Sequence, residues 1–170
     1  STVEIQDVEP SAFEAVLRFA YCNDPVLTPE NVMAIRHIAE KYQILTLSKY
    51  CDDYAYNVAD CNNFCTMLDQ AAEYRLDSCV KRLSECFADK LGSDTSEIIA
   101  SSSFMQMGYK GMQRFVQSDA LVVTEEDLFD AVLKWADSQI ASERNEDSAK
   151  SGEQTARTKQ ESLISTRYAS

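Results

Sequence analysis

Apolar residues recur three or four positions apart along most of the chain, and this spacing constrains the fold more than any other feature. It places apolar side chains on one face of a helix. Only residues 3–6 alternate apolar and polar side chains, as a half-buried strand does. The sequence therefore predicts an all-α, mainly helical fold with one short N-terminal strand. The expected buried faces include Phe13, Val16, Leu17 and Ala20; Leu47, Tyr50, Cys51 and Tyr54; and Leu128, Val132, Trp135 and Ala136.

Several polar residues mark where helices are expected to begin. Ser11 and Glu14 have the spacing of a capping box, in which each side chain accepts a hydrogen bond from a free backbone amide. Thr28 followed by Pro29 is a typical helix start, because proline tolerates the first helical position. Thr124 precedes three acidic residues, which a helix N-terminus favours.

Both ends of the chain depart from the helical pattern. A single strand needs partner strands, so we expect the N-terminal part of this domain to be missing from the sequence. Residues 141–162 contain no apolar residue larger than alanine and cannot bury enough surface to offset their ordering entropy. They are expected to form a flexible polar insert, and residues 163–168 to begin a further element.

The charge balance argues against two classes of partner. The chain has 28 acidic and 16 basic residues, a net charge of -12, so its surface repels phosphate backbones and anionic lipids. No apolar run approaches the roughly 20 residues that span a bilayer, and the N-terminus lacks the pattern of a signal peptide. We therefore expect no nucleic-acid or membrane partner, and a location in the cytoplasm or the nucleus.

No group of residues predicts a catalytic, cofactor or metal site. Cys61 and Cys65 lie one helical turn apart, but a structural zinc site needs four ligands, so we interpret all six cysteines as reduced, small core residues. His37 falls opposite the apolar face of its helix, where we expect solvent or a partner. Gly108 and Gly111 have the spacing of a nucleic-acid-clamping loop without its basic patch. A helical enzyme or metalloprotein is the least favoured hypothesis.

Residues 5–43 resemble the C-terminal half of BTB (POZ) domains. The resemblance is carried by Ile5, Asp7, Val8, Pro10, Ala12, Phe13, Val16, Leu17, Phe19 and Tyr21, then Glu30, Asn31 and Val32, and finally Ala39, Lys41, Tyr42 and Gln43. Residues 118–135 are similar to the hallmark segment of BACK domains through Ser118, Asp119, Leu121, Val123, Thr124, Glu125, Leu128, Phe129, Ala131, Val132 and Trp135. The resemblance implies a BTB half over residues 1–57 and a BACK helical bundle over residues 58–170.

The resemblance also implies a function without catalysis. BTB-BACK proteins typically dimerise, bind a cullin scaffold and present a protein substrate for ubiquitination. We therefore expect an adaptor of a cullin-RING ubiquitin ligase, with a homodimer in the full-length chain. The alternative is a self-assembling scaffold for transcriptional or cytoskeletal partners that binds no cullin.

The family's cullin contacts map onto two places in this chain. One is the junction between two helices at residues 42–45, and the other is the helical pair at about residues 60–91. An amphipathic tyrosine suits either an interface or a core, so both readings of Tyr42 remain open. The expected protein-binding residues are Tyr42, Gln43, Ile44, Leu45, Phe64 and Leu68.

Overall fold

A computed structural model describes residues 8–91 and 95–146. Over these ranges the chain forms nine α-helices, one π-helix and no strand, which confirms the all-α prediction. The expected strand at residues 3–6 and the element at residues 163–168 lie outside the described residues.

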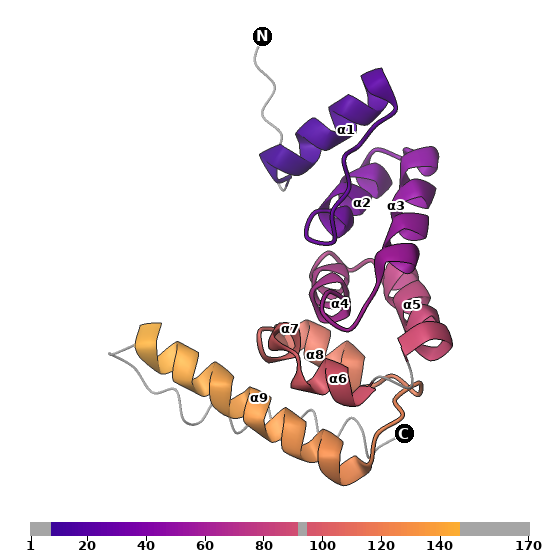
Figure 1. The fold of residues 1–170 in the computed structure, drawn as a ribbon. Coiled ribbons are helices and arrows are strands. Elements are labelled where there is room, and N and C mark those ends of the chain that lie inside the picture. Colours follow the sequence, from indigo (N-terminus) through magenta and orange to yellow (C-terminus); the bar gives the residue numbers. More distant parts are fainter. Residues whose placement is uncertain (1–7, 92–94, 147–170) are drawn as a thin grey trace.

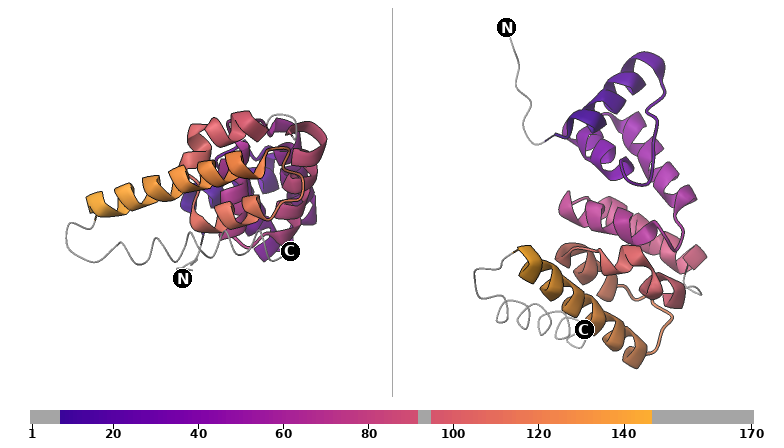
Figure 2. Two further views of the ribbon diagram at one scale, coloured as in Figure 1. Left: turned by 90° about the horizontal axis from the view of Figure 1, so that it is seen from below. Right: turned by 60° about the vertical axis from the view of Figure 1, so that its left-hand side comes forward.

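The helices are stacked in layers from α1 at one end of the molecule to α9 at the other (Figures 1 and 2). Helix α1 packs on α2, α2 on α3 and α4, α3 on α5, and α4 on α8, while α9 crosses the end of the stack against α6 and α7. The elements are α1 Pro10–Cys22, α2 Val32–Lys41, α3 Leu45–Val58, α4 Phe64–Glu73, α5 Asp77–Cys86, the π-helix Phe87–Leu91, α6 Thr95–Ala100, α7 Ser102–Met105, α8 Tyr109–Val116 and α9 Glu125–Glu146.

Two consecutive helical hairpins, α2–α3 and α4–α5, begin with the same hydrogen-bonded turn. Asn31 and Asn63 stand immediately before α2 and α4, 32 residues apart. Their Oδ1 atoms accept hydrogen bonds from the amides of Thr28 and Asp60, at 2.8 and 2.9 Å. Each Nδ2 atom donates to a carbonyl five residues earlier, at 3.1 and 2.9 Å. The asparagines fix how the chain enters each hairpin.

The same two hairpins also turn in the same way between their helices. Gln43 and Arg75, again 32 residues apart, both have a left-handed backbone with φ of 56°. The amides of the next residues, Ile44 and Leu76, donate to carbonyls five residues earlier, at 2.7 and 2.9 Å. This pairing satisfies carbonyls that a helix end leaves free. The molecule therefore contains one hairpin geometry twice.

Aromatic side chains connect neighbouring layers at equivalent places. The ring of Tyr42, at the end of α2, lies 6.2 Å from the ring of Phe13 in α1. The ring of Tyr74, at the end of α4, stacks on His37 in α2 with centroids 4.9 Å apart. His37 was expected to face solvent or a partner; it is half-buried because this second hairpin packs against it.

A buried arginine joins the first hairpin to the second. Arg36 of α2 is 8% exposed. Its Nε atom lies 2.9 Å from the Asp52 carboxylate of α3, and its terminal nitrogens reach Glu40 at 2.9 Å and Ser78 of α5 at 3.4 Å. The Cys79 thiol donates to the same Asp52 oxygen at 3.2 Å. Three helices therefore meet on one guanidinium.

Helix α8 crosses α4 closely because of Gly108 and Gly111. The amide of Gly111 donates to Asp69 of α4 at 3.2 Å. A Cβ atom on Gly111 would lie 2.5 Å from the Asp69 carboxylate and 2.8 Å from its Cα atom. Burial raises the pKa of Asp69 even though these amides donate to it. The two glycines are thus explained by helix packing.

Several predicted helix limits need correction. Helix α1 begins at Pro10, so Ser11 lies inside it and hydrogen-bonds to Glu9 at 2.5 Å, with no capping box. Helix α2 begins at Val32 with Asn31 as its N-cap residue, three residues beyond the predicted cap at residue 28. Helix α9 continues to Glu146, so residues 141–146 are helical, and the rest of the expected polar insert lies outside the described residues.

The predicted start and buried face of α9 are confirmed. Thr124 Oγ1 accepts the amide hydrogen bond of Asp127 at 3.1 Å and donates to the Asp127 carboxylate at 2.7 Å. Trp135 is 2% exposed, and its Nε1 atom donates to the carbonyl of Met107 at 2.8 Å. Helix α9 therefore begins at a side-chain cap and is held to its neighbours by a buried tryptophan.

We predict that Gly111→Ala destabilises the fold. The new methyl group would overlap the α4 backbone, and such overpacking typically costs about 1–3 kcal/mol, more than alanine gains in helix propensity. The free energy of unfolding, measured by urea denaturation, should fall. Gly108→Ala is the matched control, because the atoms nearest its Cβ would all belong to the side-chain carboxylate of Asp69, at 3.0 Å or more, with no backbone atom among them. Equal stability of the two variants would contradict the close crossing.

We also predict different losses for two arginines that pair with adjacent aspartates of α3. Arg36→Ala would leave the partly buried Asp52 without its cation, at a cost of about 2–3 kcal/mol. Arg82→Ala breaks an exposed pair with Asp53, whose side chains are 44% and 48% exposed, and should cost about 0–1 kcal/mol. Urea midpoints measure both. If Arg36→Ala lowers the free energy of unfolding no more than Arg82→Ala does, the buried pair of Arg36 and Asp52 contributes no more to stability than the exposed pair.

Candidate protein-binding surface

The junction between α2 and α3 exposes an apolar cluster, which we call the junction surface. It consists of Tyr42, Gln43, Ile44 and Leu45. Tyr42 is 46% exposed and Leu45 79%. Gln43 is exposed, whereas Ile44 packs partly against the core. Exposed aromatic and aliphatic side chains that lie together are typical of protein interfaces.

The backbone holds this surface in one geometry. The left-handed Gln43 reverses the chain, and the amide of Ile44 is fixed to the α2 carbonyl of Ala39 at 2.7 Å. Leu47, in the first turn of α3, is fully buried. Tyr42 and Leu45 are therefore displayed from a turn that is anchored on both sides, so that a partner needs to order little of it on binding.

Tyr42 is neither fully buried nor fully exposed. Its ring packs on Phe13 of α1, yet nearly half of the side chain stays accessible. Leu45 has no such second role and is the most exposed large apolar residue of the junction.

Phe64 and Leu68 do not belong to this surface. Each is 2% exposed, and the Phe64 ring lies 5.1 Å from the ring of Phe87. They point into the core because α4 is covered by α2, α5, α7 and α8. In this fold the two side chains therefore lie in the core, whereas residues 42–45 lie at or near the surface.

Some exposed residues were not anticipated. Tyr50 and Leu17 lie on predicted buried faces, but they are 53% and 44% exposed, and Tyr21 of α1 is 87% exposed. Helical spacing identifies an apolar face, but it does not say how much of that face a neighbouring helix covers. Only the arrangement of the layers separates Tyr50 from its buried neighbour Cys51.

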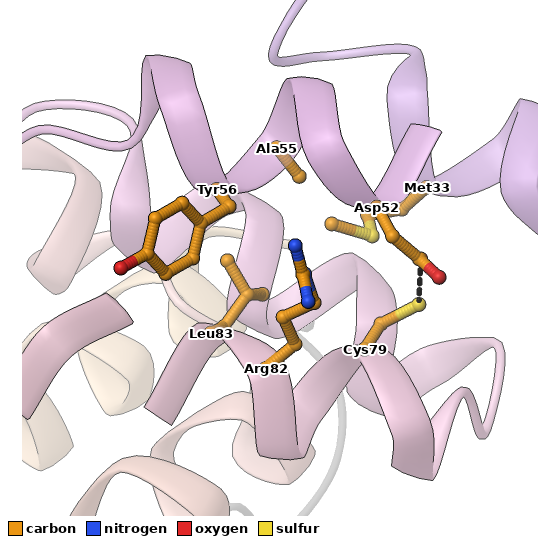
Figure 3. A pocket seen from close by; sticks show the side chains of 7 residues that line it. All are labelled: Met33, Asp52, Ala55, Tyr56, Cys79, Arg82 and Leu83. Atoms are coloured by element: carbon orange, nitrogen blue, oxygen red, sulfur yellow. Dashed lines mark hydrogen bonds between the residues drawn. The ribbon is translucent and has the colours of Figure 1, made fainter. Parts of the chain in front are cut away.

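A small pocket between α3 and α5 offers no ligand site (Figure 3). Its volume of about 10 Å³ has room for about one water molecule. The pocket is lined by Met33, Asp52, Ala55, Tyr56, Cys79, Arg82 and Leu83.

Over residues 8–91 and 95–146, no three His, Cys, Asp or Glu side chains group together as metal ligands. The helices within these ranges include none long and apolar enough to cross a membrane.

The cysteines are free thiols, and most of them are core residues as predicted. Burial raises the pKa of Cys51, Cys65 and Cys79 to about 12, which keeps them as unreactive thiols at neutral pH. Cys86 is also buried, Cys61 is partly buried and Cys22 is exposed, so the core interpretation is wrong for Cys22.

Comparison with known proteins identifies the family. The BTB/POZ domain family model matches residues 1–58, and the BACK (BTB And C-terminal Kelch) family model matches residues 64–149. The chain belongs to the BTB-BACK family, which is a family of protein-interaction adaptors. No solved structure gives a significant match.

Curated relatives agree with this assignment. The chain is 27% identical over 139 residues to BTB/POZ domain-containing protein 6-A of Danio rerio and to BTB/POZ domain-containing protein 6 of Homo sapiens. It is 25% identical over 135 residues to BTB/POZ domain-containing protein 3 of Homo sapiens. These alignments cover 82% and 79% of the chain, and the chain spans about a quarter of the length of each relative.

We predict that thiol reactivity follows burial. With a thiol-specific chromogenic reagent at pH 8, Cys22 should react in a fast phase, whereas Cys51, Cys65 and Cys79 should react only on unfolding, since they are shielded and protonated. Cys22→Ser should remove the fast phase, and Cys79→Ser should leave it unchanged. Because Cys61 is only partly buried, a fast phase that survives Cys22→Ser and Cys61→Ser together would mean that a thiol described as buried is accessible.

Proposed function

We propose that the protein is a substrate-recognition adaptor of a cullin-RING ubiquitin ligase, without catalytic activity of its own. The observation that carries the proposal is the junction surface, which is apolar, exposed and rigid. Its residues are those that the family resemblance implies for a cullin contact. The partners would be a cullin scaffold and a protein substrate, in the cytoplasm or the nucleus.

The residues of the junction suit an interface of this kind. A few aromatic and aliphatic side chains usually supply most of the binding energy of an interface, provided that their neighbours exclude water. Leu45 offers an exposed apolar side chain, and Tyr42 adds a ring supported by Phe13. Gln43 and the partly buried Ile44 complete the contact at its base. A complementary apolar groove on the cullin scaffold would cover all four.

Rigid stacking is consistent with an adaptor role. An adaptor accelerates transfer by holding two partners close together, so it needs fixed separation more than reactive groups. The ion pairs of Arg36 and the close crossing of α4 and α8 connect the layers between the junction surface and α9. A substrate bound beyond α9 would therefore stay at a defined distance from the scaffold.

Leu45→Ala tests the proposal with little risk to the fold, because the side chain is 79% exposed. Truncation of an interface anchor should weaken binding of the cullin N-terminal domain by about 1–2 kcal/mol, roughly 5–30-fold in Kd. Isothermal titration calorimetry with the 170-residue chain measures it. Val122→Ala is the matched control, because Val122 is 69% exposed at the other end of the stack.

The outcomes separate the two functional hypotheses. Binding that is weakened by Leu45→Ala and by Tyr42→Ala, but not by Val122→Ala, supports the cullin contact at the junction. Binding that both junction variants leave unchanged would move the contact elsewhere. Absence of binding by the wild-type protein would favour the self-assembling scaffold. Tyr42→Ala needs a thermal melt beside it, because the loss of its packing on Phe13 lowers stability as well.

A further inference from the structure

The connection from α1 to α2 is an accessible, non-helical segment. It spans residues 23–31 and runs along the outside of the stack (Figures 1 and 2). The side chains of Asp24 and Val26 are exposed, and Thr28 is half-buried. Residues 24–28 belong to neither a helix nor a turn. An enzyme can therefore bind this segment without first unfolding a helix, which is what modification of a folded protein requires.

The pair Thr28 and Pro29 has no helix-capping role in the structure. Its spacing predicted a helix start, but α2 begins only at Val32. Proline has no backbone N–H, so a protein kinase whose substrate groove offers no acceptor at that position selects proline after the phosphorylated residue. The three prolines of the chain follow Glu9, Asp24 and Thr28. Thr28 is thus the only serine or threonine in the sequence that precedes a proline.

The second hairpin carries an anion at the equivalent place. Asp60 lies 32 residues after Thr28. Its Oδ1 atom accepts hydrogen bonds from the amides of Asn62 and Asn63, at 2.8 and 3.0 Å. In the first hairpin the amide of Asn31 donates to the carbonyl of Thr28 instead, at 3.2 Å. The same asparagine turn therefore accommodates a negative group in one copy and has a neutral hydroxyl in the other.

We propose that Thr28 is a phosphorylation site for proline-directed Ser/Thr kinases, and that the turn before α2 binds the phosphate through the amides of Glu30 and Asn31. These amides correspond to the pair that the Asp60 carboxylate binds. In the transfer, the hydroxyl oxygen of Thr28 bonds to the γ-phosphorus of ATP, the bond to the β-phosphate oxygen breaks and ADP leaves. The hydroxyl proton passes to the catalytic aspartate of the kinase.

The phosphate would hold the connecting segment in one conformation. The Nδ2 atom of Asn31 already donates to the carbonyl of Val26 at 3.1 Å, which closes residues 26–31 into a turn. A phosphate on Thr28 adds charge-assisted hydrogen bonds inside that turn. Exposed Glu30 opposes the added charge, but repulsion between exposed groups is screened by solvent. The proposal concerns a different part of the chain from the junction surface and does not depend on cullin binding.

The first test is phosphorylation of the folded 170-residue chain by a proline-directed Ser/Thr kinase with ATP, followed by mass spectrometry. We expect one phosphoryl group, located on Thr28. Thr28→Ala should remove it, and Pro29→Ala should slow its addition by at least about 10-fold, because the new amide would lack an acceptor in the kinase. Thr46→Ala is the matched control: Thr46 is exposed but precedes no proline, so this variant should be phosphorylated like the wild type.

A peptide of residues 23–33 shows whether the segment is accessible in the folded protein. The folded chain should be phosphorylated at a rate similar to that of the peptide. Phosphorylation of the peptide without phosphorylation of the folded chain would overturn the proposal, and so would a phosphoryl group that persists in Thr28→Ala.

Amide hydrogen exchange, followed by NMR, tests the binding of the phosphate. Exchange at the amides of Glu30 and Asn31 should slow by at least about 5-fold on phosphorylation, because both gain a hydrogen-bond acceptor. Thr28→Asp supplies a carboxylate without a kinase and should slow the same two amides relative to Thr28→Ala. Asp60→Ala should have the opposite effect on the equivalent amides of the second hairpin. Unchanged exchange at both amides of the phosphorylated chain would overturn the assigned contact and the proposal with it.

Discussion

The buried guanidinium of Arg36 lies where α2, α3 and α5 meet, and it hydrogen-bonds to side chains on the other two helices. A cation with so little exposure is stable only while its partners stay in place, since an unpaired buried charge is costly. The angle between the first and second hairpins is therefore fixed by polar geometry in addition to apolar packing. The Cys79 thiol adds a further donor to the Asp52 carboxylate. The joint therefore sets how α5 lies against α2 and α3.

The layers after the joint are positioned by close contacts of a different kind. Gly111 lets α8 approach α4, and the Asp69 carboxylate accepts the amide hydrogen bond that would otherwise be lost at that helix end. Trp135 then ties α9 to the carbonyl of Met107. The junction turn is held separately, by the hydrogen bond from the amide of Ile44 to Ala39 and by the buried Leu47.

The sequence allowed the helical fold to be predicted better than the surface. The Thr124 cap and the buried Trp135 followed from local rules, since capping and amphipathic spacing depend on residues a few positions apart. The exposure of Tyr50 and the burial of Phe64 and Leu68 depend on which helices cover which faces. All three are apolar residues at helical spacing, and only the layered arrangement assigns one to the surface and two to the core.

The repeated hairpin changes the meaning of the boundary between the two matched families. The BTB match ends at residue 58 and the BACK match begins at residue 64, so the boundary falls between two copies of one 32-residue unit. These copies share a packed interface and the Arg36 joint, so the division between the families does not separate two independently packed bodies. Helix layers are typically 8–10 Å apart. Loss or gain of one such unit during evolution would shift the helices that follow it by about that spacing. The number of hairpins would then set the distance between the two ends of an adaptor of this family.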